Sequence, residues 1–284
     1  MKATWQEATT EAGQRFVFRS FGDGPLVVLI HGFPDTPHGW ERIASALADA
    51  GYRAVTPWLR GYRPNTIVEG RSYDAIAISE DAIALLDALG EHDAILVGHD
   101  WGAVITYGAA ALAPERFRAV VPIAIPYPPL YPRSPKLLWA ARHIFTNRLP
   151  WAERSLRRAD FKQLDRLYHR WSPNWHGPER DRTLAAAKEC LADPRCLTAA
   201  LGYYRDLSPS RAAELPNLPR IPAVPVGGSG DFDPGLYGKT AALFAPGSEA
   251  VVLDGGHWPH RESEDAFIAS LIDFVKRVDR PKTT

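Results

Sequence analysis

The segment GHDWGA, residues 98–103, places an aspartate where nucleophilic chemistry is possible. Gly98 and Gly102 frame Asp100 with the glycine spacing of a nucleophile elbow, a sharp strand-to-helix turn that presents its central side chain. A serine in such a turn attacks acyl carbon, whereas a carboxylate is suited to displacing a leaving group from saturated carbon. The alkyl ester formed can then be hydrolysed at its carbonyl. Asp100 therefore predicts displacement followed by hydrolysis, and the alternative is that it only caps the following helix.

Three other loops follow short apolar runs and contain residues that could complete such a reaction. They are HGFP at 31–34, GGSGDFDP at 227–234 and DGGHWPH at 254–260. The loops supply backbone donors, a second carboxylate and a histidine, so the chain order is nucleophile, acid, base. His257 is the candidate base that deprotonates water for ester hydrolysis.

The elements that must position these loops alternate between two patterns. Apolar runs typical of strands lie at 26–30, 53–56, 94–97, 119–125, 223–226 and 250–253. Stretches such as 41–51 and 73–90 carry apolar residues at the spacing of amphipathic helices. Unbroken apolar strands alternating with helices indicate an α/β fold with a mostly parallel sheet flanked by helices. Because ligands bind at the carboxyl ends of such strands, we expect the four loops to meet there.

The middle of the chain differs from its flanks. Residues 126–216 are bounded by proline-dense stretches and hold 16 Lys and Arg against 9 Asp and Glu, a net charge of +7. Proline clusters mark segment boundaries, so we predict a core domain from residues 1–125 and 217–284 with a helical insertion at 126–216. The excess charge is interpreted as a solvated, arginine-rich helix face.

Composition excludes several classes of function. The chain has 284 residues, 33 basic and 33 acidic side chains, and 45% hydrophobic residues. This balance argues against a nucleic-acid partner, and the absence of a long apolar segment argues against a membrane partner. The N-terminus lacks a signal peptide, which predicts a cytoplasmic location. Cys190 and Cys196 lack zinc-ligand spacing, so we expect reduced thiols, no metal and no cofactor. Nothing in the sequence indicates an oligomeric state.

Together, the loops around His31, Asp100 and His257 resemble the α/β-hydrolase fold with an inserted cap. More narrowly, they resemble its epoxide hydrolase and haloalkane dehalogenase branch, in which aspartate replaces the nucleophilic serine. The resemblance implies an oxyanion hole formed by the backbone N–H groups of Phe33 and Trp101.

The loop 227–234 offers two candidates for the acid that orients His257. The family pattern G-x-x-D matches Gly228 to Asp231, so the resemblance favours Asp231. Asp233 stays as the alternative, because either aspartate could instead close a turn or cap the next helix.

Within the insertion, residues 201–206 (LGYYRD) resemble the lid segment in which epoxide hydrolases carry Tyr before Arg. This makes Tyr204 the candidate proton donor to the epoxide oxygen, with Tyr203 as its packed neighbour in contact with substrate. The alternative is that Tyr204 is only a buried core aromatic.

A second lid donor is expected in the family, and LYHRW at 167–171 offers Tyr168 or His169, with Trp171 as another possible donor. Many haloalkane dehalogenases carry Asn where this chain has Phe33, so the resemblance implies an epoxide hydrolase. Its substrates would be a small apolar epoxide and water. The alternatives are a haloalkane dehalogenase, which would act on a haloalkane, and a non-catalytic binding protein with this fold.

The remaining histidines beside these loops are expected to have supporting roles. His31 and His99 are predicted to pack beneath the site with hydrogen-bonded rings. For His260 we expect solvent exposure or a supporting contact.

Overall fold

The computed structural model describes residues 4–231 and 233–280. Within these residues the strands form one sheet of order β1-β2-β4-β3-β5-β6-β7-β8. The strands are β1 (Trp5–Thr9), β2 (Arg15–Phe21), β3 (Leu26–Ile30), β4 (Arg53–Pro57), β5 (Ala94–His99), β6 (Phe117–Ile123), β7 (Val226–Gly228) and β8 (Val251–Leu253). Pairing is antiparallel between β1 and β2 and between β2 and β4, and parallel across the rest of the sheet.

The two faces of the sheet are buried under different helices. Every residue of β3 is buried, and successive side chains of a strand point to opposite faces. Val28 and Ile30 join the cluster that includes α2 (Ala75–Leu89) and α3 (Trp101–Leu112). Val27 and Leu29 join the cluster of α1 (Glu41–Asp49) and α13 (Glu264–Val278). This double coverage explains why the central strands are continuously apolar.

Local sequence sets the ends of the core helices. Helix α2 begins at Asp74, whose carboxylate accepts hydrogen bonds from the backbone N–H groups of Ile76 and Ala77. It ends at Gly90, which adopts the left-handed conformation with φ 69°. Asp74 is the N-cap and Gly90 the C-cap of the helix, and both residue types are favoured at these positions. The stretch 73–90 is therefore helical as predicted, with bounds set by its caps.

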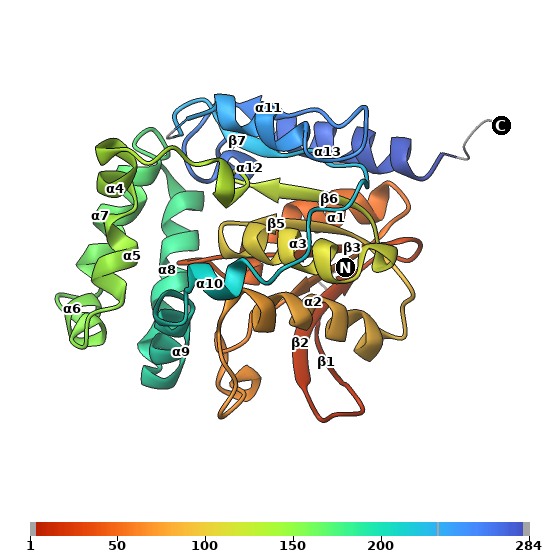
Figure 1. Ribbon diagram of the computed structural model, residues 1–284. Coiled ribbons are helices and arrows are strands. Elements are labelled where there is room, and N and C mark those ends of the chain that lie inside the picture. Colours follow the sequence, from red (N-terminus) through yellow and green to blue (C-terminus); the bar gives the residue numbers. More distant parts are fainter. Residues whose placement is uncertain (1–3, 232, 281–284) are drawn as a thin grey trace.

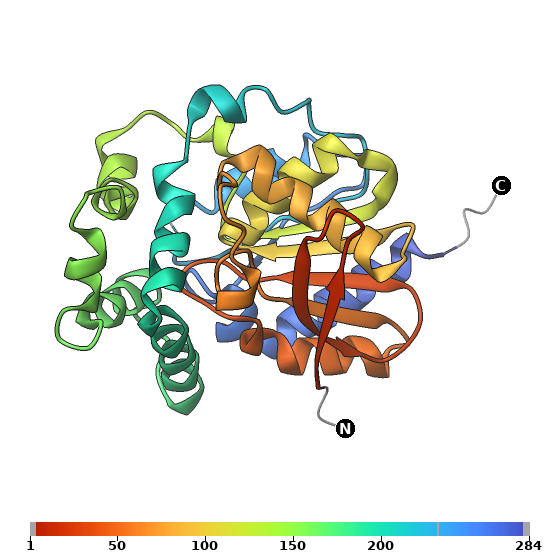
Figure 2. The ribbon, with the colours of Figure 1, turned by 90° about the horizontal axis from the view of Figure 1, so that it is seen from below.

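The segment between β6 and β7 contains helices and no strand among its described residues. Its helices are α4 (Pro135–Ala140), α5 (Arg142–Asn147), α6 (Ala152–Arg157), α7 (Lys162–Trp171), α8 (Pro178–Ala192), α9 (Pro194–Arg205) and α10 (Pro209–Ala212). Figure 1 shows α4 to α9 gathered on the side toward which β6 points, and Figure 2 shows the same green and teal helices set apart from the sheet. The helices therefore lie toward the carboxyl ends of the parallel strands.

Two details of the sheet differ from the sequence prediction. The hairpin of β1 and β2 was not predicted, because β1 is the edge strand and both strands mix exposed with buried residues. The strand predicted at 223–226 begins only at Val226. Pro222 and Pro225 remove backbone donors, and Ala223 keeps a single bridge to Val120.

Two further findings concern membrane spans and cysteines. No helix within residues 4–231 and 233–280 has the length and apolar character needed to cross a bilayer.

Cys190 and Cys196 form no disulfide, and burial raises the pKa of the Cys196 thiol to about 11. Both residues are therefore free cysteines in this structure.

Candidate active site

Asp100 lies between β5 and α3 in a conformation that is unusual for its residue type. Its φ is 55° and its ψ is −114°, a region that non-glycine residues rarely adopt. The close approach of the neighbouring loop requires a glycine, because a Cβ at Gly32 would lie 2.5 Å from the Asp100 Cβ. The Asp100 side chain makes no capping hydrogen bond to α3. The alternative that Asp100 is only a helix cap is therefore wrong.

The two carboxylate oxygens of Asp100 face different partners. Oδ1 accepts a hydrogen bond of 2.8 Å from the Phe33 backbone N–H, and Oδ2 lies 3.5 Å from His257 Nε2. Burial opposes ionisation of Asp100, but its contact with His257, the charge of His99 and the Phe33 amide together lower its pKa below the ordinary value. The buried carboxylate is therefore ionised at neutral pH.

The loop after β3 and the start of α3 lie on the same side of this carboxylate. Phe33 supplies the observed donor to Oδ1, and Trp101 is the first residue of α3. The first N–H groups of a helix lack partners within the helix and favour negative charge. The structure therefore brings Phe33, Trp101 and Asp100 together, as the sequence predicted.

His257 follows β8 and is held mainly through its backbone. Its N–H lies 3.0 Å from both the Trp171 carbonyl and the Ser172 Oγ. This approach requires Gly256, since a Cβ there would lie 2.2 Å from the Trp171 carbonyl oxygen. The His257 Nε2 atom is buried and makes no hydrogen bond to the described residues. The imidazole therefore faces the Asp100 carboxylate through its Nε2 atom.

A buried polar cluster supports His257 from below. His99 Nε2 donates a hydrogen bond of 2.8 Å to the His257 carbonyl. The His260 ring stacks on the Trp40 ring, with the ring centroids 4.6 Å apart. His99 and His260 are both buried. The supporting roles predicted for these two histidines are therefore confirmed, and the alternative that His260 is exposed to solvent is wrong. Asp35, His99 and His260 are the described residues that place potential metal-ligand atoms within 4.8 Å of one another.

His31 has the supporting role predicted for it. Its ring is fully buried, and its Nε2 atom accepts a hydrogen bond of 3.1 Å from the Leu59 backbone N–H. The ring therefore fixes the turn after β4, and the prediction is confirmed.

Asp231 lies in a loop that is joined to the His257 loop. The Gly230 N–H donates a hydrogen bond of 2.9 Å to the Gly255 carbonyl. The Tyr237 hydroxyl donates a hydrogen bond to Asp231 Oδ2. Asp233 instead accepts from the Gly235 N–H at 3.1 Å, closing its own turn. The structure thus gives Asp233 a local turn role.

Tyr204, near the end of α9, lies over the loops that hold Asp100. Its ring is edge-on to Phe33 and to Trp101, with centroids 5.3 Å apart in both pairs. The hydroxyl is buried and makes no hydrogen bond of normal geometry to the described residues. Burial and the Asp100 charge raise the Tyr204 pKa well above its ordinary value, while the side chains of Trp101 and Asn147 oppose this rise. The hydroxyl is therefore protonated and available to a ligand.

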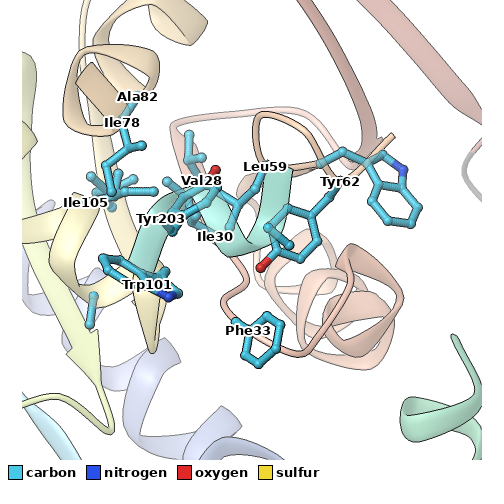
Figure 3. Close-up of a cluster of buried hydrophobic side chains, with 14 of the residues drawn as sticks. Val28, Ile30, Phe33, Leu59, Tyr62, Ile78, Ala82, Trp101, Ile105 and Tyr203 are labelled. Carbon is cyan, nitrogen blue, oxygen red and sulfur yellow. The ribbon is translucent and has the colours of Figure 1, made fainter. Parts of the chain in front are cut away.

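The structure corrects the donor role predicted for Tyr168 or His169, and it shows Tyr203 as a packed residue. The Tyr203 hydroxyl donates 2.9 Å to the Arg60 carbonyl, and its ring lies among core side chains beside Trp101 (Figure 3). The Tyr168 hydroxyl donates 2.7 Å to the Pro34 carbonyl, and Tyr168 is buried. His169 is exposed. Packing and backbone bonds occupy both tyrosines, so they do not offer free hydroxyls.

Trp171 and an unpredicted residue, His143, complete the wall of the site. The Trp171 ring packs on His257 with centroids 4.5 Å apart and on His143 at 4.7 Å. The His143 ring is also edge-on to Tyr204 at 5.9 Å. Burial lowers the pKa of His143 to about 4, so the imidazole is neutral at pH 7. No sequence motif indicated a role for His143, which is one of the histidines of the insertion.

A pocket of about 200 Å³ adjoins this wall between α5 and α7. It reaches the site at Phe33 and His143, and its other lining residues are Arg142, Thr146, Asn147, Leu156, Gln163, Leu164, Arg166, Leu167 and Arg170. Three arginines thus line a cavity. Arg166 and Arg170 are exposed and Arg142 is partly exposed, so arginines of the predicted solvated face also border this pocket.

Comparisons with known proteins identify the family of this fold. The family model described as the alpha/beta hydrolase fold matches residues 25–263. The AB hydrolase superfamily protein YfhM of Bacillus subtilis is 31% identical over 264 residues, which cover 89% of this chain and 91% of that protein. An epoxide hydrolase of Caballeronia sordidicola is 46% identical over 107 residues, covering 37% of this chain and 32% of that protein.

A solved structure extends the similarity over nearly the whole chain. An epoxide hydrolase from an endophytic Streptomyces superposes with a TM-score of 0.79 at 26% identity, covering 96% of this chain and 95% of that one. The match therefore includes the helices between β6 and β7 as well as the sheet. The chain belongs to the α/β-hydrolase fold family.

Proposed function

We propose that the protein hydrolyses an epoxide to a vicinal diol through a covalent ester on Asp100. The observation that carries this proposal is the pairing of Asp100 with Tyr204. A buried, ionised carboxylate is held by the Phe33 amide. The buried Tyr204 hydroxyl, which makes no hydrogen bond of normal geometry to the described residues, lies over the same loops. These are the nucleophile and proton donor that ring opening at saturated carbon requires.

In the first step, Asp100 Oδ2 attacks an epoxide carbon and forms the ester bond. The carbon–oxygen bond of the ring breaks, and its electron pair moves to the epoxide oxygen. Tyr204 donates its proton to that oxygen, because the alkoxide formed is a stronger base than the phenolate left behind. The Phe33 N–H keeps Oδ1 in place during the attack.

In the second step, His257 removes a proton from water, and the hydroxide adds to the ester carbonyl carbon of Asp100. The Phe33 and Trp101 amides stabilise the oxyanion on this carbon. Its collapse releases the diol, which takes the carboxyl proton, and Asp100 is again a carboxylate. The proton on His257 returns to the Tyr204 phenolate, so the balance is one epoxide and one water consumed per diol formed.

Asp231 is proposed to orient His257 during this step. Its loop is hydrogen-bonded to the His257 loop through Gly230 and Gly255, and Asp233 is engaged in its own turn. An aspartate beside a catalytic imidazole fixes the ring orientation and stabilises the imidazolium. Asp231 is therefore the better candidate of the two.

The remaining features support a cap over the site. We propose that residues 126–216 act as this cap and that Trp171 bounds the substrate space beside His257, because the two rings are in contact. Tyr168 and Tyr203 contribute packing to the cap in this proposal. The names of the Caballeronia and Streptomyces relatives give independent support for an epoxide substrate.

Diol formation tests the proposal directly. Purified protein should convert styrene oxide to its diol, and the Asp100→Asn variant should lose this activity while keeping the thermal unfolding midpoint of a folded protein. Styrene oxide consumption should equal diol production. Equal turnover by Asp100→Asn and the wild type would contradict the assignment of the nucleophile.

A further inference from the structure

The pocket between α5 and α7 combines two kinds of lining. Leu156, Leu164 and Leu167 are buried and form an apolar part. Arg142 and Arg170 also line the pocket. Arg142 is partly exposed and donates a hydrogen bond of 2.6 Å to the Trp139 carbonyl, and Arg170 is exposed. The pocket is therefore amphipathic, and its charged side chains are all positive.

Among the described residues, the arginines that line this pocket have no acidic partner. In the described part of the chain, Arg142, Arg166 and Arg170 take part in no ion pair. Other cap arginines are paired, such as Arg205 with Glu153. Arg142 also acts directly on Arg170: partial burial and the Arg142 charge both lower the pKa of Arg170. Two positive side chains that line one pocket without an acidic partner favour an anion there.

The pocket also lies beside the proposed proton donor. Its lining includes Phe33 and His143, and both rings are edge-on to Tyr204, at centroid distances of 5.3 and 5.9 Å. A ligand that fills the pocket therefore ends one aromatic ring away from Tyr204. A molecule with one end at Asp100 and the other in the pocket passes this ring.

We propose that the preferred epoxide carries a carboxylate, which binds at Arg142 and Arg170 while an apolar chain lies along the leucines of the pocket. This inference rests on the proposed function and specifies its substrate class. A guanidinium group matches a carboxylate with paired hydrogen bonds, and the anion relieves the repulsion between the two arginines. The expected apolar substrate is thereby replaced by an amphipathic one.

Binding of unreactive analogues tests this proposal without requiring turnover. Octanoate and octanamide share the apolar chain and differ in charge. Calorimetric titration of the wild-type protein should give a dissociation constant about tenfold lower for octanoate, the scale expected for charge-assisted hydrogen bonds at a partly exposed site. The double variant Arg142→Gln/Arg170→Gln should bind both compounds equally.

A matched variant controls for the loss of positive charge. Arg182→Gln changes an exposed cap arginine that does not line the pocket, and it should keep the preference for octanoate. Equal binding of both compounds by the wild type would overturn the proposal, and so would a preference that survives the double variant. Turnover of 7,8-epoxyoctanamide tests the proposed function separately, because this neutral epoxide does not require the arginines.

Discussion

Tyr203 and Tyr204 are consecutive residues with buried side chains, yet their hydroxyls are in opposite situations. The Tyr203 hydroxyl donates to the Arg60 carbonyl at 2.9 Å, whereas the Tyr204 hydroxyl makes no hydrogen bond of normal geometry to the described residues. A buried polar group without a partner costs stability. Its retention beside Asp100 is explained if the Tyr204 hydroxyl serves the reaction.

Tyr204→Phe should therefore reduce activity without reducing stability. Loss of a positioned general acid typically lowers the rate by about 10² to 10⁴. The free energy of unfolding should change by no more than about 0.5 kcal/mol, because the hydroxyl makes no hydrogen bond of normal geometry to the described residues. Steady-state diol formation and urea unfolding measure the two effects on the same preparation. A variant with wild-type turnover would remove Tyr204 from the mechanism.

Tyr203→Phe is the matched control, with the opposite expected result. It removes a hydrogen bond to a buried carbonyl, so unfolding should become easier by about 1 kcal/mol, while diol formation stays near the wild-type rate. A comparable rate loss in both variants would show that the hydroxyls act through packing. Bromide release from a bromoalkane, unaffected by Tyr204→Phe and without epoxide opening, would instead favour a haloalkane dehalogenase.

Asp231→Asn and Asp233→Asn should separate the two aspartates of one loop. Asp231→Asn should slow ester hydrolysis by several orders of magnitude, as expected when a catalytic histidine loses its orienting carboxylate. Asp233→Asn removes one turn hydrogen bond and should leave the rate within about twofold, because it lies outside the chemistry. Single-turnover kinetics of ester formation and decay give the comparison. The reverse order of effects would move the assignment to Asp233.

Asp35 should make stability depend on pH. Burial raises its pKa from 3.8 to about 6, against the charge of Arg261 and the hydrogen bonds from Thr36 and Trp258. Between these values the folded protein holds a proton that the unfolded chain has released, so this residue's contribution to stability falls as pH rises. Ionised Asp35 then opposes folding at neutral pH.

Asp35→Asn removes this titration. The free energy of unfolding of the variant minus that of the wild type should increase by about 2 kcal/mol between about pH 4.5 and pH 7.5. Urea unfolding at both pH values measures this difference. A pH-independent difference would mean that Arg261 keeps Asp35 ionised throughout.

Much of the fold could be predicted because its signals are local. The unbroken apolar run of β3 and the capped pattern of α2 match the structure closely. The β1 and β2 hairpin could not be predicted, because both strands mix exposed with buried residues and carry no long apolar run. The late start of β7 depends on prolines that interrupt an otherwise apolar segment.

The site also contains residues that could be predicted from the sequence and residues that could not. Asp100, Phe33 and His257 follow strands in a fixed chain order, so their meeting could be predicted from topology. The cap residues could not, because helix packing decides which side chains face the site. Tyr168 has the right residue type but donates to Pro34, while His143 reaches Tyr204 and Trp171 without any sequence motif.

The covalent ester on Asp100 is the central claim, and the His257→Gln variant tests it most directly. This variant should still form the ester but should hydrolyse it very slowly, because no base activates water. Intact-mass analysis after addition of styrene oxide should show protein plus one whole epoxide, and peptide mapping should place the added mass on Asp100. Unmodified protein together with full turnover, or an adduct on any other residue, would contradict the two-step mechanism.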